Sequence, residues 1–299
     1  MSTGRIDWKD QRAFLAVLDS GSLSGAARSL MLAQPTVRRR IEALEARLGT
    51  ALFTRAPNGL VPTAQALALG PHVRGMAAAS EAFVRAASAS PGAIGGTVRL
   101  TVSEFVGIEV LPAMLGSLRR DHPGLTIEIA LSNQPADLLG QEADIAVRMT
   151  EPRQGALIAR YVGAIPLRFF AHRAYAAAHG LPDSLDALAG HALIGPDRAA
   201  SDLALVAGLD PAMEPVRFAI RTDSHAGQAA AIRAGLGIGV LQLPIGAAAP
   251  DLVAVLPDFA VHQLDTWIVT HEDLRRTPRV AVVFDHLVAT FRAYVGARG

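Results

Sequence analysis

The chain has 299 residues, of which 51% are hydrophobic and 18% are charged, and its formal net charge at pH 7 is +1. This length suits about two domains, and the composition excludes a mainly disordered protein. Because the sequence contains no cysteine, disulfides, thiolate catalysis and cysteine-based zinc sites are excluded. Residues 1–90 hold 11 basic and 6 acidic residues, a net charge of +5, which leaves −4 for the remainder. A basic segment favours an anionic partner, and a chance excess is the alternative.

The sequence predicts neither a signal peptide nor a membrane span. Arg5, Asp7 and Lys9 fall where the apolar core of a signal peptide would lie. The least charged stretch, residues 234–250, is interrupted by prolines and four glycines, so it cannot form a spanning helix of about 20 apolar residues. We therefore expect a cytoplasmic protein without a membrane partner.

The amino-terminal segment predicts short helices separated by tight turns. Phe14, Val17 and Leu18 recur at helical spacing, and residues 19–22 end this first helix. A second, alanine-rich helix follows directly. Ser22 or Ser24 can provide its N-terminal cap.

The third helix, from residue 34 to a stop at Gly49, is the most informative segment. Pro35 fits its first turn, where a missing N–H costs nothing. At 100° per residue, Arg39 lies about 200° from Val37 and thus opposite the apolar face. Arginines near the start of a short helix suit the major groove of DNA, and an ordinary surface helix is the alternative. The predicted buried face consists of Val37, Ile41, Leu44 and Leu48.

Residues 52–62 predict a small β-hairpin that turns at Asn58-Gly59. An alanine-rich helix is expected from Thr63 to about Ser90, with a kink at Pro71. Such a helix would span about 42 Å, too long to pack within a domain of about 60 residues. We therefore expect its apolar stripe to pack against a second chain. That stripe consists of Leu69, Val73, Met76 and Phe83.

Beyond a linker at residues 88–96, strands alternate with helices, which indicates parallel sheets with crossover helices. The last predicted helix runs from Pro278 to about Tyr294. Its apolar face consists of Val280, Val283, Phe284, Leu287 and Phe291. The predicted strands cover residues 98–102, 127–131, 145–147, 167–171, 218–222 and 238–241.

The order of the first elements describes a helix-turn-helix with a hairpin wing. In this region the sequence resembles the LysR-type transcriptional regulators. The similar segments are Phe14-Leu15-Ala16-Val17, Gly21-Ser22-Leu23-Ser24-Gly25-Ala26-Ala27, Gln34-Pro35-Thr36-Val37, Arg39-Arg40-Ile41-Glu42-Ala43-Leu44-Glu45, Leu48-Gly49 and Leu52-Phe53-Thr54-Arg55. Later landmarks have counterparts at residues 96–100, 122–125, 143–148 and 234–240, so the resemblance covers essentially the whole chain.

The resemblance implies a winged helix-turn-helix DNA-binding domain at residues 1–62, a dimerising linker helix at 63–90 and an effector-binding domain at 91–299. The effector domain is expected to be an α/β sensor with two Rossmann-like lobes, like a periplasmic binding protein. Lobe I would cover about 96–162 and 266–299, and lobe II about 163–265.

The sequence departs from the family pattern at three places. Ala33 replaces a capping serine, so a helix cap worth about 1 kcal/mol is expected to be missing. Arg38 replaces a small polar residue and adds positive charge to the reading face. Ala66 and Pro71 alter the start of the linker helix.

The expected DNA contacts divide into bases and phosphates. The helix from Gln34 is expected to read base edges, while the wing and basic groups hold phosphates. The expected partners are near-palindromic promoter DNA, a second copy of the chain in a homodimer or tetramer, a small-molecule effector, and RNA polymerase as a further candidate. The expected DNA-binding residues are Ser22, Ser24, Gln34, Pro35, Thr36, Arg38, Arg39, Arg40 and Arg55.

An effector site is expected beyond the carboxyl ends of the parallel strands, where helix N-termini present free N–H groups. Ser103 and Arg148 are expected to share the oxygens of a small carboxylate. Glu104 and Asp223 oppose a strongly anionic ligand, which favours a zwitterion or a weakly charged metabolite. Loop capping and an Arg148–Glu104 ion pair are the alternative. The expected effector residues are Ser103, Glu104, Phe105, Asn133, Arg148, Thr222, Asp223 and Ser224.

No catalytic, metal or cofactor site is expected. The glycines at 235, 237 and 239 follow a helix and precede a strand, the reverse of a phosphate-binding loop, so we interpret them as a helix stop and turn. His225 is interpreted as a structural or surface group, because the histidines lack metal-ligand spacing. Asp223, Ser224 and His225 are adjacent, which cannot by itself produce the geometry of a catalytic triad.

The sequence thus predicts a DNA-binding transcriptional regulator that responds to a small molecule. Two alternatives share parts of this pattern. A pure solute-binding protein would have the same sensor fold, but residues 1–60 argue against it. A ligand-processing enzyme with an accessory DNA-binding module would need a nucleophile, metal or cofactor motif, and the sequence contains none.

Overall fold

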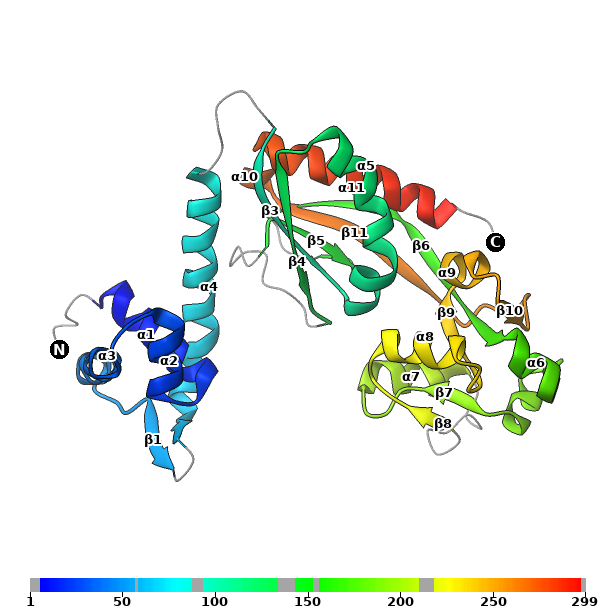
Figure 1. Cartoon of the computed structure of the whole chain (residues 1–299), viewed down its shortest axis with the longest axis horizontal. Helices are drawn as coiled ribbons and strands as arrows, with labels where there is room; N and C mark the ends of the chain where they lie inside the picture. Colours follow the sequence, from blue (N-terminus) through cyan, green and yellow to red (C-terminus); the bar gives the residue numbers. More distant parts are fainter. Residues whose placement is uncertain are drawn as a thin grey trace. The chain divides into compact units, whose positions relative to one another are not determined.

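A computed structural model describes residues 6–56, 59–87, 94–133, 143–152, 156–209 and 218–296. The residues up to Ala87 form one compact unit, and the described residues beyond it form a second (Figure 1). Most of the predicted linker, residues 88–93, lies outside the described part. Among the residues that the structure describes, no helix combines the length and apolar character needed to cross a membrane.

The first unit has three short helices, a hairpin and a long helix. The helices begin and end where the sequence predicts, because local caps determine these points: Ser22 accepts from the backbone N–H of Gly25 at 3.0 Å, and Gly49 ends its helix with φ of +68°. Ala33 provides no side-chain cap, as predicted. The elements are α1 (Trp8–Ser20), α2 (Leu23–Leu30), α3 (Gln34–Leu48), β1 (Phe53–Ala56), β2 (Gly59–Pro62) and α4 (Ala64–Ala87).

The core of the first unit contains the predicted apolar faces of α1 and α3. Val37, Ile41 and Leu44 are buried, as expected. The prediction for Leu48 is wrong: it is 36% exposed, because it lies in the last position of α3, beyond the packed part of the helix. The core residues are Ala13, Phe14, Val17, Ala26, Ala27, Val37, Ile41, Leu44, Leu52, Ala66 and Val73.

The first half of α4 belongs to this core, which corrects the expectation that its whole stripe packs against a second chain. Val73 is 6% exposed, and Leu69 packs against the same cluster. Arg74 forms an ion pair with Asp19 of α1 at 2.5 Å. Helix α4 is a single α-helix that continues through Pro71 (Figure 1). Of the predicted stripe, the two residues in its second half, Met76 and Phe83, are exposed.

Strands β1 and β2 pair in antiparallel fashion, with Ala56 opposite Gly59. The connecting residues 57 and 58 lie outside the described part of the chain. Asn58 of the predicted turn therefore lies outside the described residues, and Gly59 is the first residue of β2. Its φ of +137° and its close approach to Gly21 both require glycine at this position.

The second unit is built on one mixed sheet of nine strands, in the order β4-β3-β5-β11-β6-β9-β7-β8 with β10 paired to β6. Strand β3 is parallel to β4 and β5, and β7 is parallel to β8 and β9. The strands are β3 (Gly96–Val102), β4 (Leu125–Leu131), β5 (Ile145–Arg148), β6 (Leu157–His172), β7 (Leu193–Gly195), β8 (Phe218–Arg221), β9 (Ile238–Gln242), β10 (Leu252–Val255) and β11 (His262–His271).

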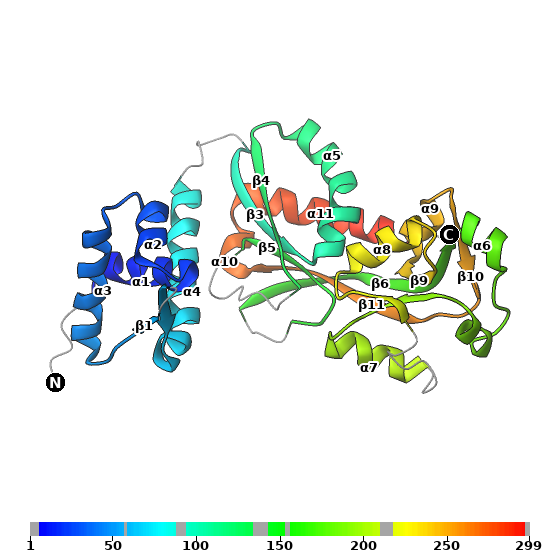
Figure 2. The same ribbon diagram turned by 60° about the horizontal axis from the view of Figure 1, so that its bottom comes forward.

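Helices cover the sheet and complete two lobes. Helices α5 and α11 lie side by side against the lobe formed by β3, β4 and β5 (Figures 1 and 2). Helix α11 buries all five residues of its predicted apolar face. The helices are η1 (Val106–Val110), α5 (Leu111–Asp121), α6 (Arg173–His179), η2 (Asp186–Gly190), α7 (Ala200–Leu209), α8 (His225–Arg233), α9 (Leu243–Ala248), α10 (Glu272–Arg275) and α11 (Pro278–Gly296).

Two long antiparallel strands, β6 and β11, run from one lobe into the other, which the sequence pattern did not predict. Their register shifts between Thr266 and Trp267, opposite Gly163 and Tyr161. Gly163 has φ of +124°, and a Cβ there would lie 2.6 Å from Val295. The lobe boundaries expected from the sequence, at 162/163 and 265/266, fall at this bulge.

Candidate functional site

A hollow of 270 Å³ lies in the first unit between the helix-turn-helix and the wing. The start of α2 contributes its serines to this hollow, and α3 and the hairpin each contribute one arginine. Two guanidinium groups with hydroxyl and amide groups form a surface suited to a phosphodiester. The lining residues are Ser22, Leu23, Ser24, Gln34, Arg38, Arg55, Ala56, Gly59 and Leu60.

The exposed face of α3 carries most of the predicted DNA-reading residues. Gln34, Pro35, Arg38 and Arg39 are exposed, and Thr36 is half-buried. Arg38 also lines the hollow next to the wing, whereas Arg39 does not, so the two neighbouring arginines lie in different surroundings.

Arg40 occupies a different position from its two neighbours. It is half-buried, and its Nη1 donates to the backbone carbonyl of Lys9 in α1 at 3.3 Å. This contact directs the guanidinium toward the body of the domain. Of the predicted basic residues on α3, Arg40 is therefore the one with a structural partner in this arrangement.

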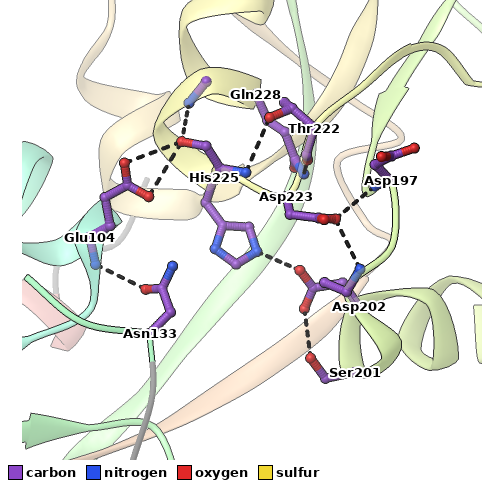
Figure 3. Close-up of polar contacts among 12 residues, drawn as sticks. Glu104, Asn133, Asp197, Ser201, Asp202, Thr222, Asp223, His225 and Gln228 are labelled. Atoms are coloured by element: carbon purple, nitrogen blue, oxygen red, sulfur yellow. Dashed lines mark hydrogen bonds and ion pairs between the residues drawn. The ribbon is translucent and has the colours of Figure 1, made fainter. Parts of the chain in front are cut away.

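The predicted effector residues come from the loops that follow the parallel strands, as expected. Ser103, Glu104 and Phe105 follow β3, and Asn133 follows β4. The structure brings Glu104 and Asn133 together, since the Glu104 N–H donates to Asn133 Oδ1 at 3.0 Å (Figure 3). Phe105 is buried in the core at 6% exposure, which places it beneath this surface.

Glu104 also contacts the other lobe. The hydroxyl of Ser224 lies 3.4 Å from each carboxylate oxygen of Glu104. Ser224 is at the same time the N-cap of α8, as predicted, and accepts from Gly227 N–H at 3.1 Å. The long distance to Glu104 indicates a weak contact across the two lobes.

Three of the predicted effector residues accept hydrogen bonds from nearby backbone N–H groups. Asp223 Oδ1 accepts from the N–H groups of residues 197, 198 and 199 at 2.8, 2.9 and 3.0 Å. These bonds lower the pKa of Asp223 and make it a loop cap. Thr222 accepts from Ser224 N–H at 3.2 Å, and Ser103 accepts from Val106 N–H at 3.4 Å. The capping alternative therefore describes Ser103, Thr222 and Asp223 better than the expected anion site.

Arg148 forms hydrogen bonds with its own strand β5 and with β3, and not the ion pair with Glu104 that was the alternative expectation. Its guanidinium donates to Val147 O at 2.9 Å and to the carbonyl and hydroxyl oxygens of Thr101 at 3.4 and 3.3 Å. Burial lowers the pKa of Arg148. The guanidinium is thus occupied by the sheet, and neither an ion pair with Glu104 nor a shared carboxylate with Ser103 explains its position.

The structure adds an ion pair that the sequence analysis did not identify. His225 Nε2 lies 2.8 Å from Asp202 Oδ2, and Ser201 donates to the other carboxylate oxygen at 3.3 Å (Figure 3). The bond to Asp202 raises the pKa of His225, and the charges of Glu104 and Asp223 add to this effect. Asp202 lies on α7, more than 20 residues earlier, so only the fold brings the pair together.

The described residues contain no group of three histidine, aspartate or glutamate side chains that could hold a metal ion. Between the lobes, Glu104 and Asn133 lie on one side, and Ser224 and the His225–Asp202 pair lie on the other. Polar groups of both signs face one another there. Polar groups arranged in this way can orient a small ligand through hydrogen bonds and charge.

Comparisons with known proteins identify a family for each of the two units. Residues 8–67 match the model for bacterial regulatory helix-turn-helix proteins of the lysR family, and residues 91–292 match the LysR substrate binding domain. A helix-turn-helix joined to a two-lobed binding domain defines a ligand-responsive regulator of transcription. The chain belongs to the LysR family.

Relatives and solved structures extend over different shares of the chain. A transcriptional regulator from Xanthomonas campestris pv. campestris is 31% identical over 185 residues, 62% of this chain and only 54% of the relative's own length. The mau operon transcriptional activator of Paracoccus denitrificans is 28% identical over 289 residues, 91% of this chain and 92% of the activator. The structure of CbnR with its target DNA, 20% identical, covers 95% of this chain and 99% of its own, with a TM-score of 0.66. This last similarity concerns the fold.

Proposed function

We propose that this LysR-family regulator recognises promoter DNA by reading bases with α3 and holding phosphates with the wing. The observation that carries this proposal is the hollow that Arg38 and Arg55 line together with the start of α2. Arg39 and Gln34 lie on the exposed face of α3 and would contact base edges. CbnR, which shares this fold, has been solved with its target DNA. The proposed contacts are Ser22, Ser24, Gln34, Pro35, Thr36, Arg38, Arg39 and Arg55, with Arg40 in a supporting position.

The functional chain is proposed to be a homodimer on a near-palindromic site. The exposed second half of α4 supports this arrangement, since Met76 is 42% and Phe83 is 76% exposed. These two residues replace the four-residue stripe expected from the sequence, because Leu69 and Val73 pack within their own unit. Residues 1–62 and 63–90 are the proposed DNA-binding and linker segments, with the core of the first segment extended by α4.

The effector is proposed to bind between lobe I, about 96–162 and 266–299, and lobe II, about 163–265. Glu104, Asn133 and Ser224 support this placement, because they meet across the two lobes. A zwitterionic or weakly charged metabolite could replace the long Ser224–Glu104 contact with shorter hydrogen bonds of its own. His225 and Asp202 join this set, while Arg148 and Asp223 support it from the sheet and the loop.

The protein is proposed to act as a regulator in the cytoplasm, where bacterial promoters lie, and not as an enzyme. RNA polymerase is a proposed further partner through which binding would alter transcription. The family assignment supports these inferences, since both matched models describe a regulator and its binding domain.

The decisive experiment is to isolate the chromosomal DNA bound by the purified full-length chain and to measure its affinity at several salt concentrations. We expect one class of sites to be retained at moderate salt, with an affinity at least about 10³-fold above that for unrelated DNA. Retention that disappears at moderate salt for every sequence would contradict the proposal. Turnover of a ligand that binds between the lobes would favour the enzyme alternative.

A further inference from the structure

Helix α8 is contacted at both of its ends by one short segment of lobe I, residues 104–110. At its start, Ser224 lies 3.4 Å from the carboxylate of Glu104. At its end, Arg233 donates from Nη1 and Nη2 to the two carboxylate oxygens of Glu109, at 2.8 and 2.6 Å. Because α8 belongs to lobe II, both contacts join the lobes.

The local backbone explains why Glu109 occupies this position. Residues 106–110 form a π-helical turn between two α-helical stretches, and Leu111 N–H donates to the carbonyl of Val106. Pro112 follows directly and has no N–H to donate to Ile108, so a wider turn relieves the clash that an α-helix would have here. Gly107 lets the turn approach the sheet, since a Cβ at this position would overlap the side chain of Leu131.

The Glu109–Arg233 pair has the geometry of a strong contact. A bidentate arginine–carboxylate pair fixes the orientation of both side chains, because two parallel hydrogen bonds must be satisfied at once. Arg233 lowers the pKa of Glu109, and Glu109 raises the pKa of Arg233 through the same bonds. The side chain of Glu109 is only 17% exposed, so solvent screens this pair less than an open surface pair.

A third contact also joins the lobes. The Tyr294 hydroxyl on α11 donates to Gln242 Oε1 on β9 at 2.7 Å, and Gln242 is 4% exposed. Burial raises the pKa of Tyr294, and the charge of Glu109 raises it further, which places the tyrosine within reach of the ion pair's field. The lobes are thus joined by the contacts Glu104–Ser224, Glu109–Arg233 and Gln242–Tyr294.

We propose that Glu109 and Arg233 are positioning residues whose ion pair holds α8 against lobe I and sets how far the two lobes close over the effector. The consequence for the effector rests on the proposed function, but the effect of the ion pair on the distance between the lobes can be tested without effector or DNA. Strands β6 and β11 connect the lobes at a bulge, and the contacts of α8 with residues 104–110 join the lobes away from those strands. An effector that favours one degree of closure would therefore act on this pair.

The test measures the distance between the lobes in the full-length chain. Because the chain contains no cysteine, Ala113→Cys on α5 and Ala207→Cys on α7 provide the only two spin-labelling sites, both at exposed positions. Labelled chain is diluted into excess unlabelled chain so that only distances within one chain contribute. Glu109→Gln and Arg233→Gln are each expected to lengthen and broaden the distance distribution.

Two further variants make the result specific to the pair. The charge reversal Glu109→Arg with Arg233→Glu is expected to restore the original distribution. Asp285→Asn breaks the 2.7 Å Arg275–Asp285 pair, which lies within lobe I alone, and is expected to leave the distribution unchanged.

Unchanged distributions in both single variants, with native far-UV circular dichroism, would overturn the proposal. So would a shift that the charge reversal does not restore, because lost packing would then be its cause. Neither outcome depends on DNA binding or on an effector, so each is distinguishable from a failure of the proposed function.

Discussion

The backbone N–H of Leu60 donates a hydrogen bond of 2.8 Å to the carbonyl oxygen of Gly21. This bond joins the wing to the turn between α1 and α2. The neighbouring Gly59 lies so close to the same carbonyl that a Cβ would be 2.6 Å from it. The placement of Arg55 beside α2 and α3 therefore depends on a close backbone contact that the glycines at positions 21 and 59 permit.

Replacing Gly59 by alanine is expected to lower the free energy of unfolding by about 2 kcal/mol, because φ of +137° and the clash with Gly21 both oppose a side chain. Urea unfolding measures this loss. Gly49→Ala is the matched control, since Gly49 also has positive φ but open space around it, and should cost about 1 kcal/mol. Equal losses in the two variants would mean that the contact with Gly21 does not matter.

Arg39→Ala is expected to weaken specific binding by about 1–3 kcal/mol and to relax the preference at one or two base pairs. The reason is that Arg39 lies on the exposed face of α3, away from the wing. Fluorescence anisotropy with a selected site and single-base variants of that site would measure both effects. Arg40→Ala serves as the comparison, with a smaller effect because its guanidinium bonds to Lys9. Unchanged binding by the Arg39 variant would show that the reading face lies elsewhere.

Arg38→Ala and Arg55→Ala are expected to weaken all DNA sequences to a similar degree. Both arginines line the hollow beside the wing, where they would neutralise phosphates. Each variant should reduce the slope of log K against log salt by about 0.9, the value for one lost phosphate contact. A titration series in potassium chloride measures this slope. A loss confined to one base pair for Arg38 would assign it to base reading instead.

Met76→Glu combined with Phe83→Glu is expected to weaken the homodimer, because both residues are exposed on the second half of α4. The fold of the first unit should survive, since neither side chain belongs to its core. Sedimentation at micromolar concentration measures the assembly, and Leu236→Glu, at another exposed apolar residue, is the control. A double variant that remained dimeric would refute this role for α4. Val73→Glu is unsuitable for the test because it would unfold the domain.

The His225–Asp202 pair predicts a dependence of stability on pH. The folded-state pKa of His225 is raised, so its contribution is full below the ordinary value of 6.5 and is lost as the pH rises through the raised pKa. The pKa of Asp202 is lowered, so its contribution is present above the ordinary value of 3.8 and is lost as the pH falls through the lowered pKa. His225→Gln should therefore destabilise the protein more at pH 6 than at pH 9.

Because the histidine side chain is 47% exposed, solvent screening limits this difference to below about 1 kcal/mol. Urea unfolding at several pH values measures it, and Asp202→Asn should remove the same dependence. An equal loss of stability for His225→Gln at pH 6 and at pH 9 would exclude the ion pair as its cause.

Features set by neighbouring residues could be predicted from the sequence. The caps at Ser22 and Ser224, the stop at Gly49 and the apolar face of α11 follow from local chemistry and helical periodicity. The helices that begin and end at these points are where the sequence placed them. The same local reasoning located the loops that meet between the lobes.

Features that depend on distant partners could not be predicted. Val73 and Met76 have the same helical pattern, yet only Val73 meets α1, so burial separates them. Arg148 and Asp223 looked available for a ligand until the fold supplied Thr101 and the 197–199 backbone as partners. The alternation of strands and helices likewise concealed β6 and β11, because antiparallel strands that join two lobes leave no separate periodic signal.

The continuity of α4 has a consequence for the spacing of DNA sites. One continuous helix runs from Ala66, which is buried in the core of the first unit, to Phe83, which is exposed. In the proposed homodimer, the separation between two bound half-sites would depend on the rise and rotation of this helix, about 1.5 Å and 100° for each residue. Inserting one residue into α4 would rotate one reading helix by about 100° around the axis of α4, but would move it by only about 1.5 Å along that axis. In the proposed homodimer, an insertion in α4 would therefore be tolerated best when its length is close to a whole number of helical turns, because the phase is then kept.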